Sequence, residues 1–215
     1  MLQRRAVAHS TKVPRSAAPD LPIAPAVGVS PTSAGRRVIR QRMLRVLKLD
    51  RSVYAEIERD PAGTRQAAIV VGFVATAAAV GTVLAESWHL GAVVGAVAAA
   101  LVHWLLWSGL EHLIGVALFH THIPLAREAR ALGYAQTPEL FAILAFVPAV
   151  GTWIVSVSRL LTMLAGSQAI ITSAHLRRHQ ALAIRLVSFV IAFLAAAGVR
   201  AVLGDVRFMT ALLRP

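Results

Sequence analysis

The sequence has no cysteine and few charged residues. The lack of cysteine excludes a disulfide scaffold, a thiolate metal site and a catalytic cysteine. Only 15% of the 215 residues are charged, whereas 57% are hydrophobic and the mean hydropathy is +0.65. A soluble domain has about 25% charged and about 45–50% apolar residues. The composition therefore excludes a disordered chain and argues against an ordinary water-soluble globule.

The chain has fewer acidic than basic residues. The chain has 22 Lys and Arg against 10 Asp and Glu, for a formal net charge of +12. Residues 1–66 hold thirteen of the basic and five of the acidic residues, so the excess precedes the apolar part. A basic arm followed by an apolar body is typical of a membrane protein with a cytoplasmic tail. A nucleic-acid-binding domain would spread its basic residues over a folded polar face, so we expect no nucleic-acid partner.

The polar third of the chain divides into two segments. Residues 1–35 contain five prolines and no helical apolar stripe, which predicts a disordered tail. Residues 1–19 contain four basic residues and no acidic one before Pro19, which resembles an organellar transit peptide. We favour a floppy bacterial tail or a start codon assigned too far upstream. Residues 36–66 are predicted to form short amphipathic juxtamembrane helices, with Asp50 capping the second. The first of these helices carries six basic residues expected to lie on the membrane surface: Arg36, Arg37, Arg40, Arg42, Arg45 and Lys48.

Residues 67–203 are predicted to be an all-α, polytopic membrane helix bundle of five transmembrane helices. About 20 helical residues cross a hydrocarbon core of ~30 Å. Residues 67–85 and 90–119 each fit one span, and residues 181–203 fit the fifth. Residues 137–174 fit two spans, because Pro148 and Gly151 interrupt the run and predict a tight third-fourth hairpin. A re-entrant helix is the alternative there. Residues 120–136 are predicted to be a polar loop, and residues 204–215 a tail on the outer surface.

The distribution of arginine predicts the orientation. Nine Lys and Arg lie between Arg36 and Arg65, and more follow in the segments predicted to face the same side, whereas the two opposite turns hold none. The positive-inside rule then places the N-terminus in the cytoplasm and the C-terminus outside. We expect a multi-pass protein of the bacterial cell (inner) membrane, in contact with the anionic inner leaflet of the lipid bilayer.

Two segments resemble a known family. LDRSVYAEIERDP, at residues 49–61, resembles the segment before the first span in bacterial members of the Yip domain family. GYAQTP, at residues 133–138, resembles the motif that opens the third span there, which singles out Gly133, Tyr134 and Pro138. The resemblance covers roughly residues 45–203 and implies a five-span membrane protein with no defined reaction. Eukaryotic relatives bind prenylated Rab GTPases through a motif that this chain lacks, so Rab binding is not implied.

Ionisable residues at membrane depth are candidates for function, because burying them is costly. Glu111 lies about 32 Å along its helix from Leu90, and Arg159 about 12 Å from the same side, so these two do not pair. We expect instead an inner-layer polar cluster, at the cytoplasmic side of the bundle, whose members form structural ion pairs. A proton or cation entry site is the alternative. Its members are Glu111, His112, Glu139, Arg127, Arg130 and Arg177.

Histidine and small residues on the second span suggest two further roles. His103 lies about 20 Å deep with Ala99 one turn before it, a pattern that permits a chlorophyll or haem contact. A hydrogen-bonded histidine is the preferred interpretation, and His112 is the other candidate ligand. His120 and His122 lack a third ligand, so no metal is expected. Gly91, Gly95 and Ala99 recur every four residues and predict close helix packing, within the bundle or in a homodimer.

No phosphate loop, nucleophile elbow or pair of catalytic carboxylates is present, so we do not expect an enzyme. The leading hypothesis is a non-enzymatic membrane scaffold or accessory subunit of the Yip type, packing against lipids or other membrane proteins. One alternative is a small transporter or channel with an inner-layer Glu/His site. The other is a subunit that contacts a pigment or haem in a photosynthetic or respiratory complex.

Overall fold

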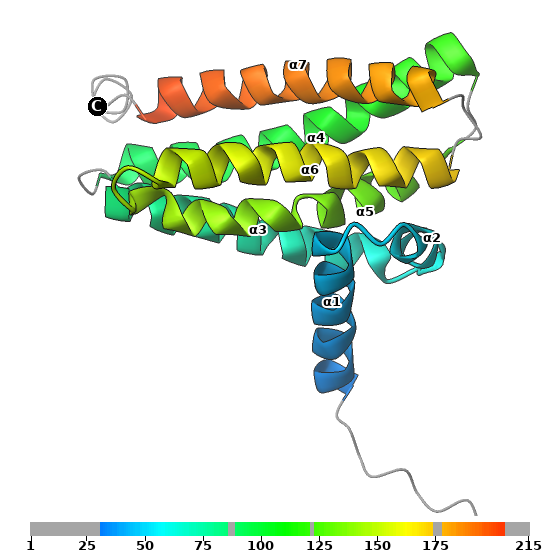
Figure 1. Ribbon diagram of the computed structural model, residues 1–215, viewed down its shortest axis with the longest axis horizontal. Coiled ribbons are helices and arrows are strands. Elements are labelled where there is room, and N and C mark those ends of the chain that lie inside the picture. Colours follow the sequence, from blue (N-terminus) through cyan, green and yellow to red (C-terminus); the bar gives the residue numbers. More distant parts are fainter. Residues whose placement is uncertain (1–30, 86–88, 121–122, 174–177, 205–215) are drawn as a thin grey trace, which may run out of the picture.

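The computed structural model describes residues 31–85, 89–120, 123–173 and 178–204, and these segments are helical with no strand among them. The predicted tail up to residue 30, Arg177, His122 and the C-terminal segment 205–215 lie outside the described residues. Two short helices come first and six further helical elements follow (Figure 1). Their bounds are α1 Pro31–Leu47, α2 Ser52–Arg59, α3 Gly63–Ala85, α4 Leu90–Phe119, α5 Leu125–Ala135, η1 Thr137–Phe146, α6 Gly151–Ser173 and α7 Arg178–Gly204.

Among the described residues, three helices are long and apolar enough to cross a membrane: α3, α4 and α7. Their outward faces carry large apolar side chains, such as Phe73 at 53% exposure, Leu105 at 60% and Leu194 at 62%. A water-soluble bundle would place polar residues on those faces, whereas a bilayer accepts apolar ones. The structure therefore supports an all-α membrane protein.

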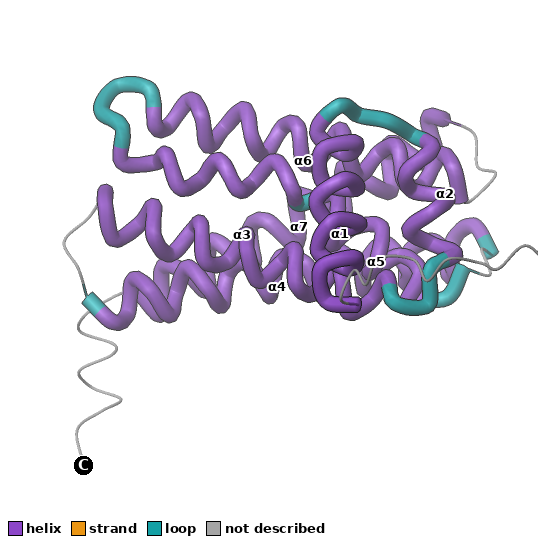
Figure 2. The backbone as a smooth tube through the Cα atoms, turned by 90° about the horizontal axis from the view of Figure 1, so that it is seen from below, coloured by secondary structure: helices purple, strands orange, loops and turns teal. Residues whose placement is uncertain are grey.

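The long helices lie side by side along one common direction (Figures 1 and 2). Helix α7 packs mainly on α4, and η1 packs against both α3 and α6. We call the end next to α1 and α2 the proximal end, and the end where α3, η1 and α7 finish the distal end. Helix α4 runs from the distal to the proximal end, so Glu111 lies near the proximal end and Ala92 near the distal one.

Helix α1 crosses the bundle axis instead of following it (Figures 1 and 2). It begins at Pro31, so residues 31–35 belong to a helix and not to the predicted tail. Ile39 and Val46 of α1 join Val53, Tyr54 and Ile57 of α2 in one buried cluster with α3 and α5. In Figure 1 α1 projects from the side of the bundle, roughly perpendicular to the long helices, which is the orientation expected of a helix on a membrane surface.

The segment between α4 and η1 differs from the sequence-based prediction. Residues 125–135 form helix α5, where a polar loop was predicted. A 3₁₀ helix, η1, follows after Gln136, and the Thr137 hydroxyl donates a hydrogen bond to the Tyr134 carbonyl at the junction. Two glycines let η1 approach its neighbours, because a Cβ on Gly81 would collide with the carbonyl of Ala142 and one on Gly151 with that of Ala145. Gln136, the one residue between α5 and η1, keeps right-handed helical angles (φ −73°, ψ −5°), so the chain changes there from an α-helix to a 3₁₀ helix inside the bundle.

Candidate functional site

The proximal half of the bundle contains a fully buried ion pair. Glu111 Oε1 of α4 lies 2.6 Å from Arg185 Nη2 of α7, and the two side chains are 2% and 1% exposed. Trp107 lies beside the guanidinium, whose carbon is 5.5 Å from the ring centroid. Gly166 of α6 makes the room, because a Cβ there would collide with both Arg185 and Trp107. The rejection of a Glu111–Arg159 pair is confirmed, although the true partner lies on α7 and not on the 120–136 segment.

The remaining residues of the predicted inner-layer cluster lie in different places. His112 Nδ1 is 3.4 Å from Glu128 Oε2 of α5, beside the buried pair. Arg127 lines a small cavity shared with Glu111. Arg130 instead binds the junction of α2 and α3, donating to Thr64 Oγ1 and to two backbone carbonyls. The structure therefore joins Glu111 and His112 through α5, and it leaves Glu139 out of this group.

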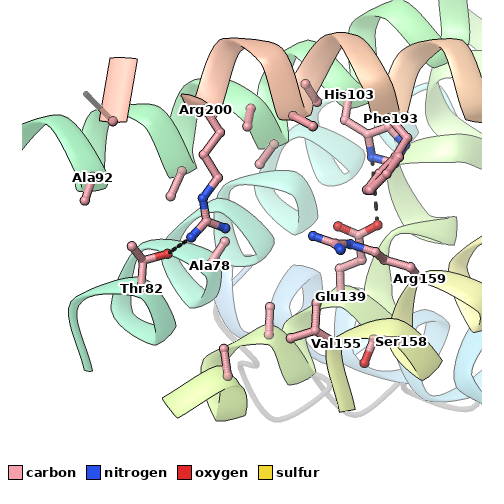
Figure 3. Close-up of a pocket in the computed structure, with 18 of the residues that line it drawn as sticks. Ala78, Thr82, Ala92, His103, Glu139, Val155, Ser158, Arg159, Phe193 and Arg200 are labelled. Atoms are coloured by element: carbon pink, nitrogen blue, oxygen red, sulfur yellow. Dashed lines mark hydrogen bonds and ion pairs between the residues drawn. The ribbon is translucent and has the colours of Figure 1, made fainter. Parts of the chain in front are cut away.

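Glu139 lies in the distal half, at the start of η1. Its Oε1 is 3.8 Å from Nδ1 of His103 on α4, and Arg159 of α6 points toward the same carboxylate (Figure 3). The Arg159 guanidinium carbon also lies 4.8 Å from the centroid of the Phe193 ring. Helices α4, η1 and α6 thus bring an imidazole, a carboxylate and a guanidinium together at the middle of the bundle.

The His103 ring is held by aromatic neighbours. It stacks on Trp107 at 5.4 Å and meets Phe189 edge-on at 5.2 Å, measured between ring centroids. The side chain is 6% exposed, and its Nε2 has no hydrogen-bond partner among the described residues. The expected hydrogen bond from His103 to a neighbouring helix is therefore not found at Nε2. Aromatic packing orients the ring instead.

These polar groups line a cavity of about 730 Å³. The lining runs from His103 and Glu139 to Ala85 and Gly204 at the distal end, and more than half of it is alanine. Arg200 of α7 points into the cavity, where its Nη2 donates a hydrogen bond of 3.1 Å to Thr82 Oγ1 of α3 (Figure 3). The volume falls within the 300–1,000 Å³ typical of small-molecule sites. Two arginines, one glutamate and one histidine are among the residues that line it.

The residues of the Yip-like motif hold α5 in place. A Cβ on Gly133 would come within 2.8 Å of Ala67 Cβ and 3.1 Å of Trp104 Nε1, so only glycine fits there. The Tyr134 hydroxyl donates to Gln66 Oε1 at 2.8 Å, and Pro138 is buried in the first turn of η1. These contacts fix the position of the helix break, and through it the position of Glu139.

The small-residue stripe of α4 faces α7. A Cβ on Gly95 would lie 3.2 Å from the Arg200 carbonyl oxygen and 3.3 Å from the Gly204 nitrogen. Gly91 is also buried, whereas Ala99 lines the cavity. The stripe thus sets the separation of α4 and α7 along the cavity wall.

Two of the six basic residues predicted to lie on the membrane surface, Arg42 and Arg45, form ion pairs within the protein. Arg42 is 5% exposed and donates to Glu56, Asp60 and Gln66, while Arg45 donates to Asp50, Ser52 and Glu56. The hydrogen bond from Arg42 lowers the pKa of Asp60. Burial alone would raise the pKa of Glu56, but hydrogen bonds from both arginines lower it overall. The other four basic residues are exposed: Arg36, Arg37 and Arg40 of α1, and Lys48 directly after it.

Asp50 acts as the predicted cap of α2. Its Oδ1 accepts hydrogen bonds from the backbone nitrogen and the hydroxyl of Ser52, the first residue of the helix. These bonds, followed by the one from Arg45, lower the pKa of Asp50 to about 2.

Sequence reasoning missed Arg185, Arg200 and Glu128 as site residues. The rule that selected Glu111, an ionisable residue inside an apolar run, applies equally to Arg185 and Arg200. Glu128 lay in the segment predicted to be a loop, so nothing marked it as buried. Among the described residues no group of three or more His, Asp or Glu could hold a metal ion.

Comparisons with protein-family models, with curated proteins and with solved structures give no match for this chain.

Proposed function

We propose that the protein is a five-span integral membrane protein that binds a small anionic ligand in the distal cavity, as a carrier does. The cavity carries this proposal, because it places Glu139, His103, Arg159 and Arg200 around one space deep in an apolar bundle. Charged groups at that depth are costly and are kept where they serve a ligand or ion pathway.

The five spans of this proposal are α3, α4, the α5–η1 pair, α6 and α7. Helix α6 has 23 residues, which is about 34 Å, and α5 with η1 adds up to about 36 Å. Both lengths suffice for a hydrocarbon core of ~30 Å. The exposed arginines of α1 at the proximal end favour the cytoplasm there, which puts the distal cavity on the outer side of the cell membrane.

The break between α5 and η1 favours transport over a purely structural role. Transporters often form their sites at mid-membrane with discontinuous helices, whose interrupted backbone lies next to the ligand. Here the change from α5 to the 3₁₀ helix η1, at Gln136, lies three residues before Glu139. Sequence analysis placed the only such break at Pro148 and Gly151, at an outer turn, and therefore ranked transport below a scaffold.

The absence of cysteine makes the proposal testable by labelling. Ala99 lines the cavity, so a cysteine is placed there by Ala99→Cys. Cells that carry this variant are treated from outside with either an anionic or a cationic methanethiosulfonate reagent of equal size. One net positive charge about 4 Å away is worth about 1 kcal/mol in water, or roughly fivefold in rate. For each thiol, the rate of labelling by the anionic reagent is divided by the rate of labelling by the cationic one. We expect this ratio to be at least fivefold higher for the cysteine at position 99 than for a free thiol in solution. Arg200→Gln should reduce the difference.

The matched control is Ala98→Cys, one residue away on α4 and not part of the cavity lining. It should react slowly and without preference for either charge. A cysteine at position 99 that is unreactive from outside, or that prefers the cationic reagent, would contradict the proposal.

A scaffold of the Yip type is the second candidate, favoured by the way α1 is held. Buried Arg42 fixes α1 across the bundle, and Arg37, Arg40 and Leu44 remain exposed, the last at 52%. Such a rigid basic surface suits contact with anionic lipid or a partner protein. If Arg37→Glu with Arg40→Glu releases partner proteins that co-purify with the intact chain, whereas Ala99→Leu has no effect, the scaffold is the better description.

A pigment or haem contact at His103 stays a prediction. An absorbance spectrum of the protein purified from its native membrane tests it, and a band beyond the protein absorbance that disappears in His103→Ala would support it.

A further inference from the structure

Resting on the proposed function, we infer that Glu139 takes up a proton from the distal cavity beside His103, and that the ligand is carried together with this proton. The site lies at the deeper end of the cavity, where η1 faces α4. Its support comes from the few partners of the carboxylate, from the cavity that reaches it and from the charges beside it.

The carboxylate of Glu139 is held much less firmly than that of Glu111. Glu111 Oε1 lies 2.6 Å from Nη2 of Arg185, so protonation of Glu111 would sacrifice a buried ion pair. Glu139 Oε1 lies 3.8 Å from Nδ1 of His103, which is too long for a hydrogen bond, and its side chain is 19% exposed. Among the described residues no donor is hydrogen-bonded to Glu139. This carboxyl group therefore loses no hydrogen bond when it takes up a proton.

The cavity gives a proton a route to Glu139 from the distal end. Glu139 and His103 both belong to its lining. A volume of about 730 Å³ has room for roughly 24 water molecules at about 30 Å³ each. Thr82 and Ser158 supply polar groups along the lining, which ordered water needs, and chains of water transfer protons. The cavity beside Glu111 has a volume of only about 10 Å³, so that carboxylate has no comparable route.

A proton on Glu139 changes the charge that a ligand meets in the cavity. Among the described residues, the other charged side chains of the lining are Arg159 of α6 and Arg200 of α7, and arginine stays protonated in proteins. His103 is the remaining ionisable group that faces the carboxylate. Uptake of one proton therefore adds one positive charge to the lining. An anion then binds more tightly to the protonated form, and by linkage the bound anion favours the proton equally.

The pH dependence of labelling at position 99 tests this site, because residue 99 lies one turn, about 6 Å, from His103 on α4. The full chain with Ala99→Cys is placed in vesicles of neutral phosphatidylcholine at an ionic strength of about 0.01 M, where screening is weak. The anionic reagent carries a sulfonate and the cationic one a quaternary ammonium group, so neither titrates. Ionisation of the thiol affects both rates alike, and the anionic-to-cationic ratio of rates then reports the charge of the lining.

We expect this ratio to rise at least threefold as the pH falls from about 8.5 to about 5.5, since one added charge about 12 Å away changes it about threefold in water. With Glu139→Gln in addition, the ratio should be constant and as high as at low pH, because glutamine imitates the protonated acid. His89→Asn is the matched control. It removes another histidine of α4, one outside the cavity lining, and asparagine can still cap the helix, so the rise should persist.

A rise that survives Glu139→Gln would overturn the assignment to Glu139, and its loss with His103→Gln would place the proton on the imidazole instead. Infrared spectra give a second measurement that needs no cysteine. The band of a protonated carboxyl group should gain intensity over the same fall in pH, and Glu139→Gln should remove this gain. Glu56→Gln, which changes a half-exposed carboxylate of α2 outside the cavity, should keep it.

The two measurements separate the proton site from the function on which it rests. If position 99 prefers the anionic reagent equally at every pH and the infrared gain is absent, the proton site is wrong while the proposed function stands. An infrared gain without a change in the labelling ratio means that the proton does not influence an anion in the cavity, which overturns the coupling. If position 99 has no preference for the anionic reagent at any pH, the proposed function itself fails.

Discussion

Replacing Glu111 by glutamine should destabilise the bundle strongly, because it leaves Arg185 charged and buried without its partner. The two groups are 2.6 Å apart and 2% and 1% exposed, so water cannot solvate the remaining guanidinium. Removing one member of a buried pair costs about 3–5 kcal/mol. Glu128 carries a second carboxylate near Arg185, so we expect about 3 kcal/mol, at the lower end.

The melting temperature of the purified protein in detergent measures this loss. For a chain of this size each 1 kcal/mol lowers the melting temperature by roughly 2–4 °C, so Glu111→Gln should lower it by roughly 6–12 °C. Arg65→Gln, which removes an exposed charge, should leave it unchanged. The exchange Glu111→Arg with Arg185→Glu should restore at least half of the loss. A melting temperature of Glu111→Gln within 2 °C of that of the unaltered protein would refute this reasoning.

Three other predictions concern the proximal end. The hydrogen bond from Arg42 lowers the pKa of Asp60 in the folded protein. The ion pair of Arg42 and Asp60 therefore stabilises the docking of α1 fully above about pH 4, which is the pKa of aspartate in an unfolded chain. This stabilisation is lost as the pH falls through the lower pKa of the folded state. The protection factors of the α1 amides, which are exchange rates divided into the intrinsic rate at the same pH, should therefore be constant from pH 7 to 5 and fall below about pH 4, whereas those of Arg42→Gln should be low at every pH. Gly133→Val should cost about 1–3 kcal/mol of stability, because its side chain would overlap Ala67; an unchanged melting temperature would show that α5 can shift. A peptide of residues 36–60 should become helical on anionic vesicles and dissociate with added salt, whereas equal binding to neutral vesicles would exclude a role for its charges.

The helices that the sequence predicts best are those with an uninterrupted apolar run. The predicted second span, 90–119, has the same bounds as α4, because His89 caps its start and His120 adopts a left-handed conformation directly after its end. The fifth predicted span, 181–203, lies within α7, and the first, 67–85, within α3. In such segments length and hydropathy alone decide the structure, and no tertiary information is needed.

Helix α5 could not be predicted in the same way. It has eleven residues, of which Arg127, Glu128 and Arg130 are charged, so its composition is that of a loop. Its helical form depends on tertiary contacts: Trp104 Nε1 donates to the Ala129 carbonyl, and Gly133 packs on Ala67. Short helices gain most of their stability from packing, which a sequence taken alone does not reveal.

The position of Glu139 was missed for a related reason. Sequence analysis took residue 137 as the start of a span at the inner surface, which placed Glu139 in the inner layer. Because α5 occupies that level, η1 starts about 16 Å further along the bundle, as eleven helical residues require. Counting 1.5 Å per residue from the end of each span correctly separated Glu111 from Arg159. The same count gave the wrong depth for Glu139, because residue 137 was taken as the inner end of a span.

The two polar clusters of this bundle differ in what surrounds them, and that difference separates structure from function. Around Arg185 the space is almost filled: Glu111 pairs with it, Trp107 lies beside it, Gly166 is small enough to admit it, and the adjoining cavity has a volume of only about 10 Å³. A ligand has no space there, so the pair can act only by holding α4 and α7 together. Around Arg200 and Glu139 the neighbours are alanines, which leave a cavity that leucine or valine would fill without loss of helix. A bundle under selection for stability alone would fill that space, because each buried methylene contributes about 0.8 kcal/mol. The retained cavity, beside charges that are costly at this depth, is therefore the observation that supports the proposed ligand site.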